Sequence, residues 1–350
     1  MIQIIQANDN DYDDMAELAR ENYGDIDISN TAYLMWQYNH NPAGKALIRI
    51  ARDGKELAAQ YINIPIRVLA DGQMVRGALS LNTITREKYR GLGLFPILAS
   101  QVFEDCINSE CAFTIGFPNP NSYPGFIRKL SFLDLGSVPL LIKPLKIAAL
   151  IKKSLCKLEP SAQNKLMLTT YDHYRKNGLI IRKLTPEDKL AIDQLWNKVK
   201  GKYPVMQVRD YEFIKWRYFD VATRNYLVLG AWKENVLQGF IVGRCTTQAG
   251  IKCGMIVDFL ILKKETNAGE TLIREIMRYF ISNNMELAGA LMLKHTEEYT
   301  LLKRNFFCRC PHFLEPQPFP MIYREHIEMD LKSLTNINHW FLTMGDYDVI

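Results

Sequence analysis

The sequence lacks the cysteine patterns of a disulfide framework or a zinc site. Its seven cysteines form an odd set, and no two of them have Cys-x-x-Cys spacing. Cys308 and Cys310 lie close together, but no histidine pair or second cysteine pair accompanies them. A structural zinc site needs a complete set of such ligands. We therefore expect reduced structural thiols and no bound metal.

No apolar run is long enough to cross a membrane. The stretch 140–155 is interrupted by Lys143, Lys146, Lys152 and Lys153, whereas a spanning helix needs ~20 consecutive apolar residues. The N-terminus alternates isoleucine with glutamine and then turns acidic. It therefore lacks the basic start and apolar core of a secretory signal. We expect a cytoplasmic protein.

Positive charge is concentrated in one connecting segment. The chain has a net charge of +5, and residues 136–178 alone carry +6. A nucleic-acid binder carries a distributed basic face, so no nucleic-acid partner is expected. Three interpretations stay open for residues 143–157: a linker helix packed on a domain, contact with an anionic membrane surface, or contact with an acidic protein or nucleotide-linked substrate.

The chain repeats itself. Residues 33–38 read Tyr-Leu-Met-Trp-Gln-Tyr, and residues 213–218 read Phe-Ile-Lys-Trp-Arg-Tyr, which places Trp36 and Trp216 180 positions apart. A predicted strand, turn and strand follow each tryptophan at the same offset. Two copies of one domain are the economical interpretation.

The predicted order of elements gives the fold class. Each copy begins with a strand and an amphipathic helix, and ends with a strand that leads into a long helix, 79–85 into 92–103 and 255–262 into 272–281. Hairpins mixed with a crossover predict an α+β fold, in which each domain is a mixed, mostly antiparallel sheet flanked by helices. We expect an N-terminal domain at 1–145, a basic linker helix at 146–178, a C-terminal domain at 179–330 and a tail at 331–350.

A glycine-containing turn is the most informative motif. The strand 79–85 runs through Arg90-Gly91-Leu92-Gly93 into a helix that starts near Leu94. Glycines let the backbone approach a ligand, and the free N–H groups at a helix start favour a pyrophosphate. By spacing alone, ordinary turn chemistry explains the glycines equally well. Two other phosphate motifs are absent: the chain has no GxxxxGK[ST], and the GxGxxG pattern fails at Pro96.

Residues 89–93 resemble the acetyl-CoA pyrophosphate loop of the GCN5-related N-acetyltransferases (GNAT). The resemblance implies two tandem GNAT-like domains and acetyl-CoA, or another acyl-CoA, as co-substrate. It implies a pyrophosphate site with Arg90 and the backbone N–H groups of Gly91, Leu92, Gly93 and Leu94. It also implies that an N–H near Ile84 holds the thioester oxygen and that Asn119 or Asn121 orients the CoA arm. Phe95, where the family often has a small residue, resembles a variant in GNAT-like proteins of bacterial polysaccharide clusters.

The usual general acid of this family is missing. In the GNAT pattern a tyrosine protonates the leaving thiolate, and the matching position here is Ile127. Tyr123, four residues earlier, is either the acid or a structural phenol. The strand position at which many GNAT enzymes place an acidic residue holds Asn82, which we expect to face the substrate.

The second copy has lost the glycine turn. At an offset of 176 residues, Gly269 corresponds to Gly93, but Thr266 and Asn267 stand opposite Arg90 and Gly91. We therefore expect a degenerate second domain. Asp258, opposite Asn82, interrupts an apolar run. It is either a paired structural carboxylate or a ligand for the substrate amine.

The C-terminal residues resemble the ending of the same polysaccharide-cluster proteins, through Trp340, Thr343, Gly345, Asp346 and Asp348. Tandem GNAT enzymes use their C-terminal carboxylate in the active site. The resemblance thus implies that Asp346, Asp348 or the carboxylate of Ile350 enters the first domain's cleft to bind or deprotonate an amine. The alternative is a tail that only docks.

These observations predict an acyltransferase that moves an acetyl group from acetyl-CoA to a primary amine. An amino sugar of polysaccharide biosynthesis is the first acceptor class, by analogy with the resembling proteins. Another small amine is the rival acceptor. A non-catalytic CoA-binding or scaffold module remains as the alternative function.

Overall fold

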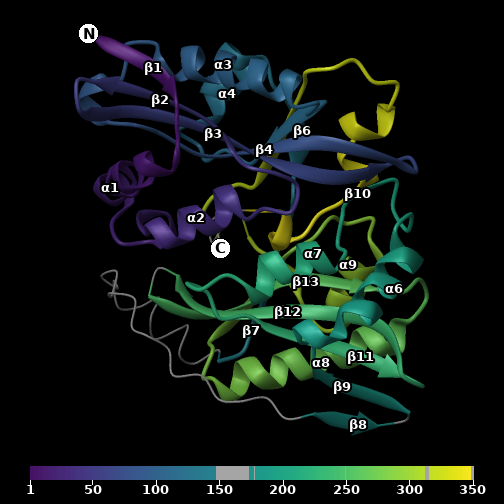
Figure 1. Cartoon of the computed structure of the whole chain (residues 1–350). Coiled ribbons are helices and arrows are strands. Elements are labelled where there is room, and N and C mark those ends of the chain that lie inside the picture. The colour runs from purple at the N-terminus through teal and green to yellow at the C-terminus, as the bar shows by residue number, and fades with distance from the viewer. Residues whose placement is uncertain (147–172, 177, 249, 312–314, 348–350) are drawn as a thin grey trace.

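The chain forms two lobes, each built on one mixed sheet with helices on its faces (Figure 1). The computed structural model describes residues 1–146, 173–176, 178–248, 250–311 and 315–347. Most neighbouring strands are antiparallel; among the described strands the parallel pairs are β4 with β5, β13 with β14 and β10 with β17. The predicted α+β class, with mixed and mostly antiparallel sheets, is confirmed.

The first lobe has the strand order β1-β2-β3-β4-β5-β16-β6, and β10 and β17 extend it beside β3. Its elements are β1 (Ile2–Gln6), α1 (Tyr12–Tyr23), α2 (Thr31–Asn39), β2 (Leu47–Asp53), β3 (Glu56–Ala70), β4 (Gln73–Thr85), α3 (Leu94–Asn108), β5 (Phe113–Gly116), α4 (Tyr123–Leu130), β6 (Leu133–Ser137), β10 (Val205–Gln207), β16 (Pro320–Glu325) and β17 (Trp340–Phe341).

The second lobe has the strand order β15-β7-β14-β13-β12-β11-β9-β8. Its elements are β7 (Leu140–Pro144), β8 (Tyr174–Lys176), β9 (Leu179–Lys183), α6 (Lys189–Val199), α7 (Tyr211–Ile214) continued by a π-helical turn (Lys215–Phe219), β11 (Leu227–Lys233), β12 (Val236–Gln248), β13 (Ile251–Ile261), α8 (Thr266–Ser282), β14 (Leu287–Leu291), α9 (Glu297–Arg304) and β15 (Cys308–Arg309).

Local sequence explains the main element boundaries. Asp71 and Gly72 both have positive φ, 48° and 80°, which suits the tight turn of the β3–β4 hairpin. The side chain of Asn30 accepts a hydrogen bond from Ala32 N–H and caps α2. Gly24, with φ of 77°, ends α1. These caps place the α1–α2 connection over the end of β4, where it lines a cavity.

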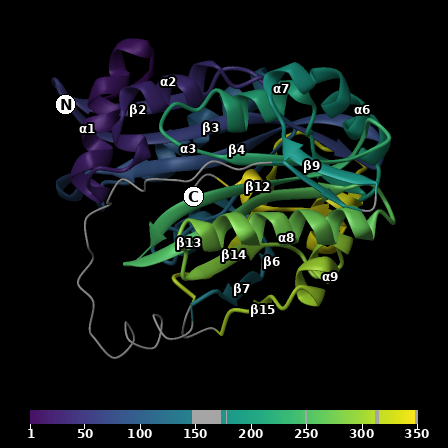
Figure 2. The same ribbon diagram turned by 90° about the horizontal axis from the view of Figure 1, so that it is seen from below.

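Three described strands cross the expected domain boundaries: β7, β16 and the short β10, which lies within 179–330 but pairs with β3 of the first sheet. β7 lies within the expected N-terminal domain 1–145, yet it pairs with β14 and β15 of the second sheet. β16 lies within the expected C-terminal domain 179–330, yet it inserts between β5 and β6 of the first sheet. Figure 2 shows β7 beside β14 and β15 of the second lobe. Each sheet therefore contains a strand that the other half of the chain supplies.

The two tryptophans that define the sequence repeat meet between the lobes. Their rings stack with centroids 4.9 Å apart and an interplanar angle of 16°. The indole N–H of Trp36 donates to the carbonyl oxygen of Trp216 at 2.8 Å, and the indole N–H of Trp216 donates to the carbonyl oxygen of Trp36 at 3.1 Å. Both residues are buried. The pair thus forms a reciprocal contact between α2 and the α7 region.

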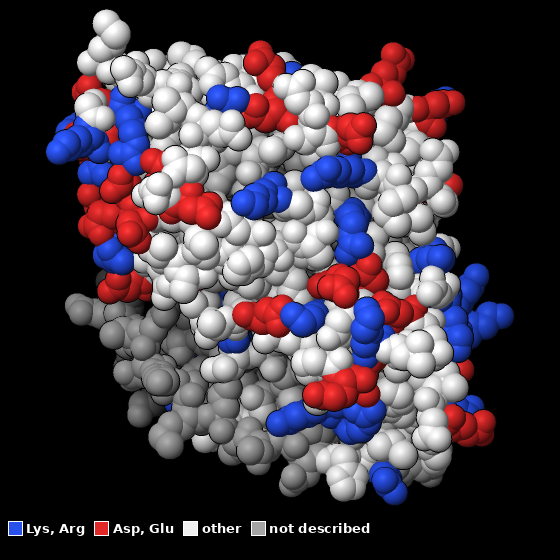
Figure 3. Space-filling view, viewed as in Figure 1, with Lys and Arg blue, Asp and Glu red and all other residues white. Residues whose placement is uncertain are grey.

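The basic segment falls largely outside the described residues, so the expected linker helix at 146–178 and the membrane contact at 143–157 stay expectations. No helix of the described chain has both the length and the apolar character to cross a bilayer. On the face shown in Figure 3, lysines and arginines are interspersed with aspartates and glutamates. That face does not show the continuous basic surface of a nucleic-acid binder.

We predict that the reciprocal tryptophan bonds stabilise the lobe interface. Trp36→Phe keeps an aromatic ring but leaves the buried carbonyl of Trp216 without its donor. The variant should lose about 1–3 kcal/mol of unfolding free energy. Denaturant unfolding followed by circular dichroism measures the loss.

Trp232→Phe is the matched control, because the indole N–H of Trp232 is buried without a hydrogen-bond partner among the described residues. Its removal should cost less. Equal losses in the two variants would show that the reciprocal bonds contribute nothing.

Candidate functional site

A large cavity opens where β4 and β5 part. The two strands pair in parallel only from Ala78–Thr114 to Ser80–Gly116, while β4 continues to Thr85. The cavity has a volume of about 780 Å³, within the range of small-molecule sites. It is lined by the end of β4, the α1–α2 connection, the start of α4 and the chain's tail: Asn22, Tyr23, Ile26, Ile28, residues 79–85, Arg90, Phe95, Phe117, Pro118, Asn119, Asn121, Ser122, Gly125, Phe126, Gln317 and Tyr347.

A β-bulge breaks the β3–β4 ladder inside this cavity. Ile62 pairs with Leu81 and Gln60 pairs with Ile84, so Asn82 and Thr83 have no register partner on β3. Asn82 has a φ of 50°, a conformation that asparagine tolerates better than most residues. Because Ile84 stays in register, the break in the ladder lies at Asn82 and Thr83. Backbone groups at a bulge leave the ladder, so donors are available there for a ligand.

Hydrogen bonds between Asn82 and α2 hold the bulge in place. The side-chain amide of Asn82 donates to the Gln37 side-chain oxygen at 2.9 Å and to the Tyr38 hydroxyl at 2.8 Å. Gln60 donates to the Asn82 carbonyl at 2.8 Å. The Asn82 side chain therefore ties β4 to α2.

The glycine turn precedes a helix start without a side-chain cap. Gly91 and Gly93 have φ of 82° and 75°, and an added Cβ would meet nothing within 4 Å at either position. Glycine is thus required there by backbone conformation and not by crowding. Gly93 is the N-cap of α3, and no side chain bonds to the first N–H groups of that helix. These N–H groups remain available to an anion.

Tyr123 turns away from the cavity. Its hydroxyl donates to Asp134 Oδ2 at 2.7 Å, and this hydrogen bond raises the pKa of Tyr123. Tyr123 is not among the cavity-lining residues, whereas Asn119, Asn121 and Ser122 just before it are. The Asn119 side-chain oxygen accepts from the N–H groups of Asn121 and Ser122 and shapes the turn before α4.

One buried arginine anchors the tail to the second lobe. Arg209 donates through Nε to both oxygens of Asp258, at 3.3 and 3.0 Å, and through Nη2 to Asp346 Oδ2 at 2.6 Å. All three residues are almost fully buried. Asp258 also accepts from the Tyr218 hydroxyl at 2.9 Å and from the Thr343 hydroxyl at 3.1 Å. Of its two interpretations, the structure shows Asp258 as a paired carboxylate.

The bonds of Asn82 and Asp258 correspond across the two lobes. Asn82 bonds to the tyrosine two residues after Trp36, and Asp258 bonds to the tyrosine two residues after Trp216. In the second lobe, residues Thr343–Asp346 pack at this position. An added Cβ at Gly345 would clash with the Tyr218 hydroxyl and would reach 3.2 Å from Asp258 Oδ2. The tail therefore fits the second lobe closely and then continues into the first.

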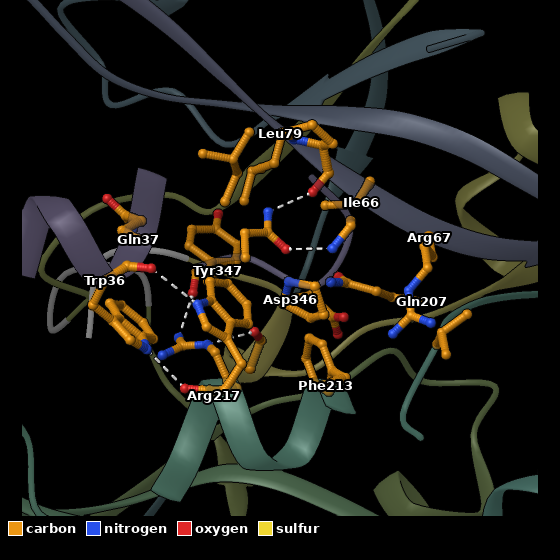
Figure 4. A pocket seen from close by; sticks show the side chains of 18 residues that line it. Trp36, Gln37, Ile66, Arg67, Leu79, Gln207, Phe213, Arg217, Asp346 and Tyr347 are labelled. Carbon is orange, nitrogen blue, oxygen red and sulfur yellow. Dashed lines mark hydrogen bonds between the residues drawn. The ribbon is translucent and has the colours of Figure 1, made fainter. Parts of the chain in front are cut away.

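A small pocket of about 30 Å³ lies between the lobes beside the large cavity (Figure 4). Asp346 lines it, and its Oδ1 is buried without a hydrogen-bond partner among the described residues. Burial and the nearby Asp258 raise the pKa of Asp346, while Arg209 opposes this effect. Arg217, also in the lining, donates to the carbonyl oxygens of Gly345 and Tyr347 at 3.2 and 3.0 Å. Tyr347 lines both this pocket and the large cavity.

The structure brings together most of the residues expected at the site. Those that line the large cavity are Asn82, Ile84, Arg90, Phe95, Asn119 and Asn121. Gly91, Leu92, Gly93 and Leu94 form the adjoining turn and helix start. Tyr123 and Asp258 lie outside the cavity lining, and Asp346 lines only the small pocket. Asp348 and Ile350 lie outside the described residues.

Three contributors were not predicted from the sequence: Arg209, Tyr347 and the pair Gln37–Tyr38. The aspartate inside the apolar strand β13 was expected to be either a paired carboxylate or a substrate ligand, and nothing in the sequence identified Arg209 as its partner. Among the described residues, no group of three or more His, Cys, Asp or Glu side chains is placed to hold a metal ion.

The N-terminal part of the chain matches a known domain. Residues 3–132, from β1 to the end of α4, match the model of the acetyltransferase (GNAT) domain. This match supports an acyltransferase enzyme. No curated protein matches the sequence.

Solved structures resemble almost the whole chain. N-myristoyltransferase from Saccharomyces cerevisiae with bound myristoyl-CoA is 14% identical with a TM-score of 0.64, and the match covers 94% of this chain and 84% of that one. A GCN5-related N-acetyltransferase from Anabaena variabilis is 10% identical with a TM-score of 0.64, covering 93% and 73%. A probable N-acyltransferase from Enterococcus faecalis is 12% identical with a TM-score of 0.61, covering 93% and 73%. At these identities the likeness shows the fold, and it extends over both lobes.

We predict that Arg209 is required for stability. Arg209→Met should lower the unfolding free energy at neutral pH by about 3–5 kcal/mol, because Asp258 and Asp346 would face each other without a cation. In this variant the folded-state pKa of Asp346, which burial and the nearby Asp258 already raise, should rise further. The loss should therefore shrink as pH falls from 7 towards 5, when the Asp346 carboxyl group takes up a proton.

Chemical denaturation at both pH values measures the effect. Arg49→Met is the control, because the Arg49–Asp105 ion pair retains partial solvent exposure, 23% and 17% of the two side chains, and should cost less. An Arg209 variant as stable as the Arg49 variant would contradict the assigned role.

Proposed function

We propose that the protein is an acyl-CoA-dependent N-acyltransferase whose reaction takes place in the cavity between β4 and β5. The observation that carries the proposal is the juxtaposition of three features around this cavity. β4 and β5 diverge and leave room for an extended ligand arm. The bulge at Asn82 frees backbone donors, and an uncapped helix start with two left-handed glycines stands at the edge.

Each feature corresponds to one part of an acyl-CoA. The N–H groups from Gly91 to Leu94 suit the pyrophosphate, with Arg90 as a neighbouring cation. Asn119 and Asn121 suit the amide groups of the pantetheine arm. Donors at the Asn82–Thr83 bulge suit the thioester oxygen, which gains negative charge when an amine attacks. In this proposal the donors to the thioester oxygen lie just before Ile84, near the backbone N–H that the family resemblance implies.

The chemistry needs no covalent enzyme intermediate. A neutral primary amine attacks the thioester carbon, the carbon–sulfur bond breaks, and an amide and free CoA result. Holding the amine and the thioester together supplies much of the rate enhancement, because it replaces a bimolecular encounter. The backbone donors at the bulge are preorganised, so they stabilise the transition state without rearranging.

We propose acetyl-CoA as the donor and an amino sugar of polysaccharide synthesis as the acceptor, in the cytoplasm. Support comes from residue likeness alone: the turn 90–95 and the ending 340–350 resemble GNAT-like proteins of polysaccharide clusters. A screen of acyl-CoA donors and amine acceptors therefore tests these two parts of the proposal.

The tail carboxylates are the proposed base. Arg209 and Arg217 direct residues 343–347 to the cavity wall, so Asp348 and the Ile350 carboxylate follow directly after a cavity-lining residue. We propose that one of these two groups takes a proton from the attacking amine. Asp346 is committed to Arg209 and serves as the anchor.

The first test is ligand-dependent thermal stabilisation. A ligand at a hundred times its dissociation constant stabilises the folded state by about 2.7 kcal/mol, so CoA and acetyl-CoA should raise Tm in a saturable way. Thiol release with a panel of amines, including amino sugars, then identifies the acceptor. Gly93→Val should abolish the CoA-dependent rise, because a side chain there stands between the helix start and the phosphates.

Gly72→Val is the matched control, since Gly72 also has a left-handed φ, 80°, and open space around it. It incurs the same backbone strain far from the cavity and should keep its CoA response. Absence of any CoA effect on the wild type would overturn the function and leave a scaffold module. Binding without thiol release for any amine would favour a non-catalytic CoA-binding module.

We further predict that the last three residues act in turnover. A chain ending at Tyr347 keeps the Arg209 and Arg217 contacts, so its CoA affinity should be unchanged. Its kcat should fall by about 10²-fold or more, the usual contribution of a general base. Asp348→Asn in the full chain separates the side chain from the terminal carboxylate. Full activity of the shortened chain would assign these residues to packing.

A further inference from the structure

An exposed phenylalanine lies in the turn between α9 and β15 of the second lobe. The side chain of Phe306 is 82% exposed, and its backbone has a φ of 65°. Among the described non-glycine residues with positive φ, Phe306 is the one with an apolar side chain. Bulky residues avoid this conformation for steric reasons. Such strain clusters at functional sites in proteins, so the turn is a candidate for a surface function.

Strand β7 holds this turn at the edge of the second sheet. Lys143 of β7 donates through Nζ to the carbonyl oxygen of Asn305 at 2.9 Å, and the same Nζ lies 5.7 Å from the centroid of the Phe306 ring. β15 follows the turn, pairs with β7 and is the last strand of its sheet. In Figure 2, β7, β15 and α9 lie together at the lower edge of the second lobe. The Phe306 ring therefore has a defined place at this edge.

Five basic side chains lie near this ring, and together with Phe306 they form what we call the β7–β15 patch. They are Lys143 and Lys146, in β7 and just after it, Lys303 and Arg304, at the end of α9, and Arg309 of β15. All except the half-buried Lys143 are exposed. Each lies within three residues of Phe306 or Lys143, so its backbone is at most about 11 Å away. Charges act over ~10 Å at 0.1 M salt, so the five cations act together.

The positive charge of the patch is not neutralised by the described residues around it. Within the described part of the chain, none of the five cations forms an ion pair with a carboxylate. Two acidic residues are close: Glu286, which is buried and accepts the backbone N–H of Lys252 at 2.9 Å, and Glu315, which lies near Cys310. Even with both counted, cations outnumber carboxylates five to two. The patch therefore combines an exposed ring with surplus positive charge.

We propose that the β7–β15 patch docks on the surface of an anionic lipid membrane. The Phe306 ring enters the headgroup region, and the five cations lie beside the lipid phosphates. Peripheral membrane binding combines these two contributions, burial of apolar area and attraction to anionic lipid. A protein interface of standard size needs about 800 Å² from each partner and a cluster of anchoring side chains, whereas a fluid lipid surface accommodates a single exposed ring.

The proposal concerns a surface and does not depend on the acyltransferase function. The sequence leaves three interpretations open for residues 143–157, and this proposal takes the membrane contact for the described part, Lys143 and Lys146. Residues 147–157 lie outside the described residues, and the proposal does not use them.

Co-sedimentation of the full chain with lipid vesicles tests the proposal. The wild type should bind phosphatidylcholine vesicles that contain about 30% phosphatidylglycerol, and it should bind pure phosphatidylcholine vesicles much more weakly. Binding should fall steeply when NaCl is raised from about 0.1 M to 1 M, because the screening length shortens from ~10 Å to ~3 Å.

Phe306→Gly tests the ring. Glycine adopts a positive φ without strain, so the Tm of this variant should equal or exceed that of the wild type. Its partition onto anionic vesicles should fall by about tenfold, because the apolar area of the ring is gone. Leu190→Ala is the matched control, since Leu190 of α6 is 71% exposed and lies outside the patch. It should bind vesicles like the wild type.

The double variant Lys303→Gln and Arg304→Gln tests the charge. Vesicle affinity should fall by about 25-fold, or about fivefold for each cation removed. The matched control is Lys263→Gln with Lys264→Gln, two adjacent exposed lysines of the same lobe. They lie at the other end of α9, where the Lys264 backbone N–H donates to Glu297, and their removal should leave vesicle affinity within about twofold of the wild type.

Three results would overturn the proposal: a wild type that does not prefer anionic vesicles, a Phe306 variant with wild-type affinity, or a double variant no weaker than its control. Salt-sensitive binding to polyglutamate without binding to vesicles would assign the patch to an acidic protein instead. Failure of the proposed acyltransferase function looks different, because the CoA-dependent rise in Tm is measured without vesicles.

Discussion

The site depends on one buried guanidinium shared by two carboxylates. Arg209 comes from the loop after β10, Asp258 from the middle of β13 and Asp346 from the tail, so three distant segments meet at one charge. Burying two carboxylates beside one guanidinium is costly unless their oxygens are hydrogen-bonded. The hydroxyls of Tyr218 and Thr343 donate to Asp258, and the Thr343 backbone N–H donates to Asp346. Together with Arg217, which donates to the carbonyl oxygens of Gly345 and Tyr347, this cation fixes the path of the tail from the second lobe to the first.

Equivalent hydrogen bonds in the two lobes have different structural consequences. In the first lobe, Asn82 bonds to Tyr38 and shapes an open cavity; in the second, Asp258 bonds to Tyr218 and recruits Arg209 and the tail. A change from amide to carboxylate at one strand position thus accompanies a change from an open cavity to an anchor for the tail. The second lobe contributes by positioning a segment that completes the wall of the first cavity.

The sequence predicted local features well and long-range ones poorly. The Trp-x-Tyr element at each tryptophan, the glycine turn before α3 and the carboxylate Asp258 in an apolar run are each visible within a short window, because periodicity, φ requirements and charge burial are local constraints. The partner of Asp258 was not predictable, since any of many arginines satisfies the same charge. The sequence also did not predict that β7 joins the second sheet and β16 the first. Both strands have ordinary strand composition, and their partners depend on which sheet edges are open in three dimensions. Tyr347 was overlooked because its position in the cavity wall depends on the long-range contacts of Arg209 and Arg217 with the tail.

The exchanged strands also set the order in which the chain can complete its structure during synthesis. β5 and β6 of the first sheet are made early, but β16, which lies between them, ends at Glu325 of a 350-residue chain. On the ribosome, the edges of β5 and β6 therefore stay open until the chain has been translated through Glu325. Open strand edges are templates for pairing with other chains. Such late closure makes a nascent chain of this kind dependent on rapid translation of its second half or on chaperones that cover those edges.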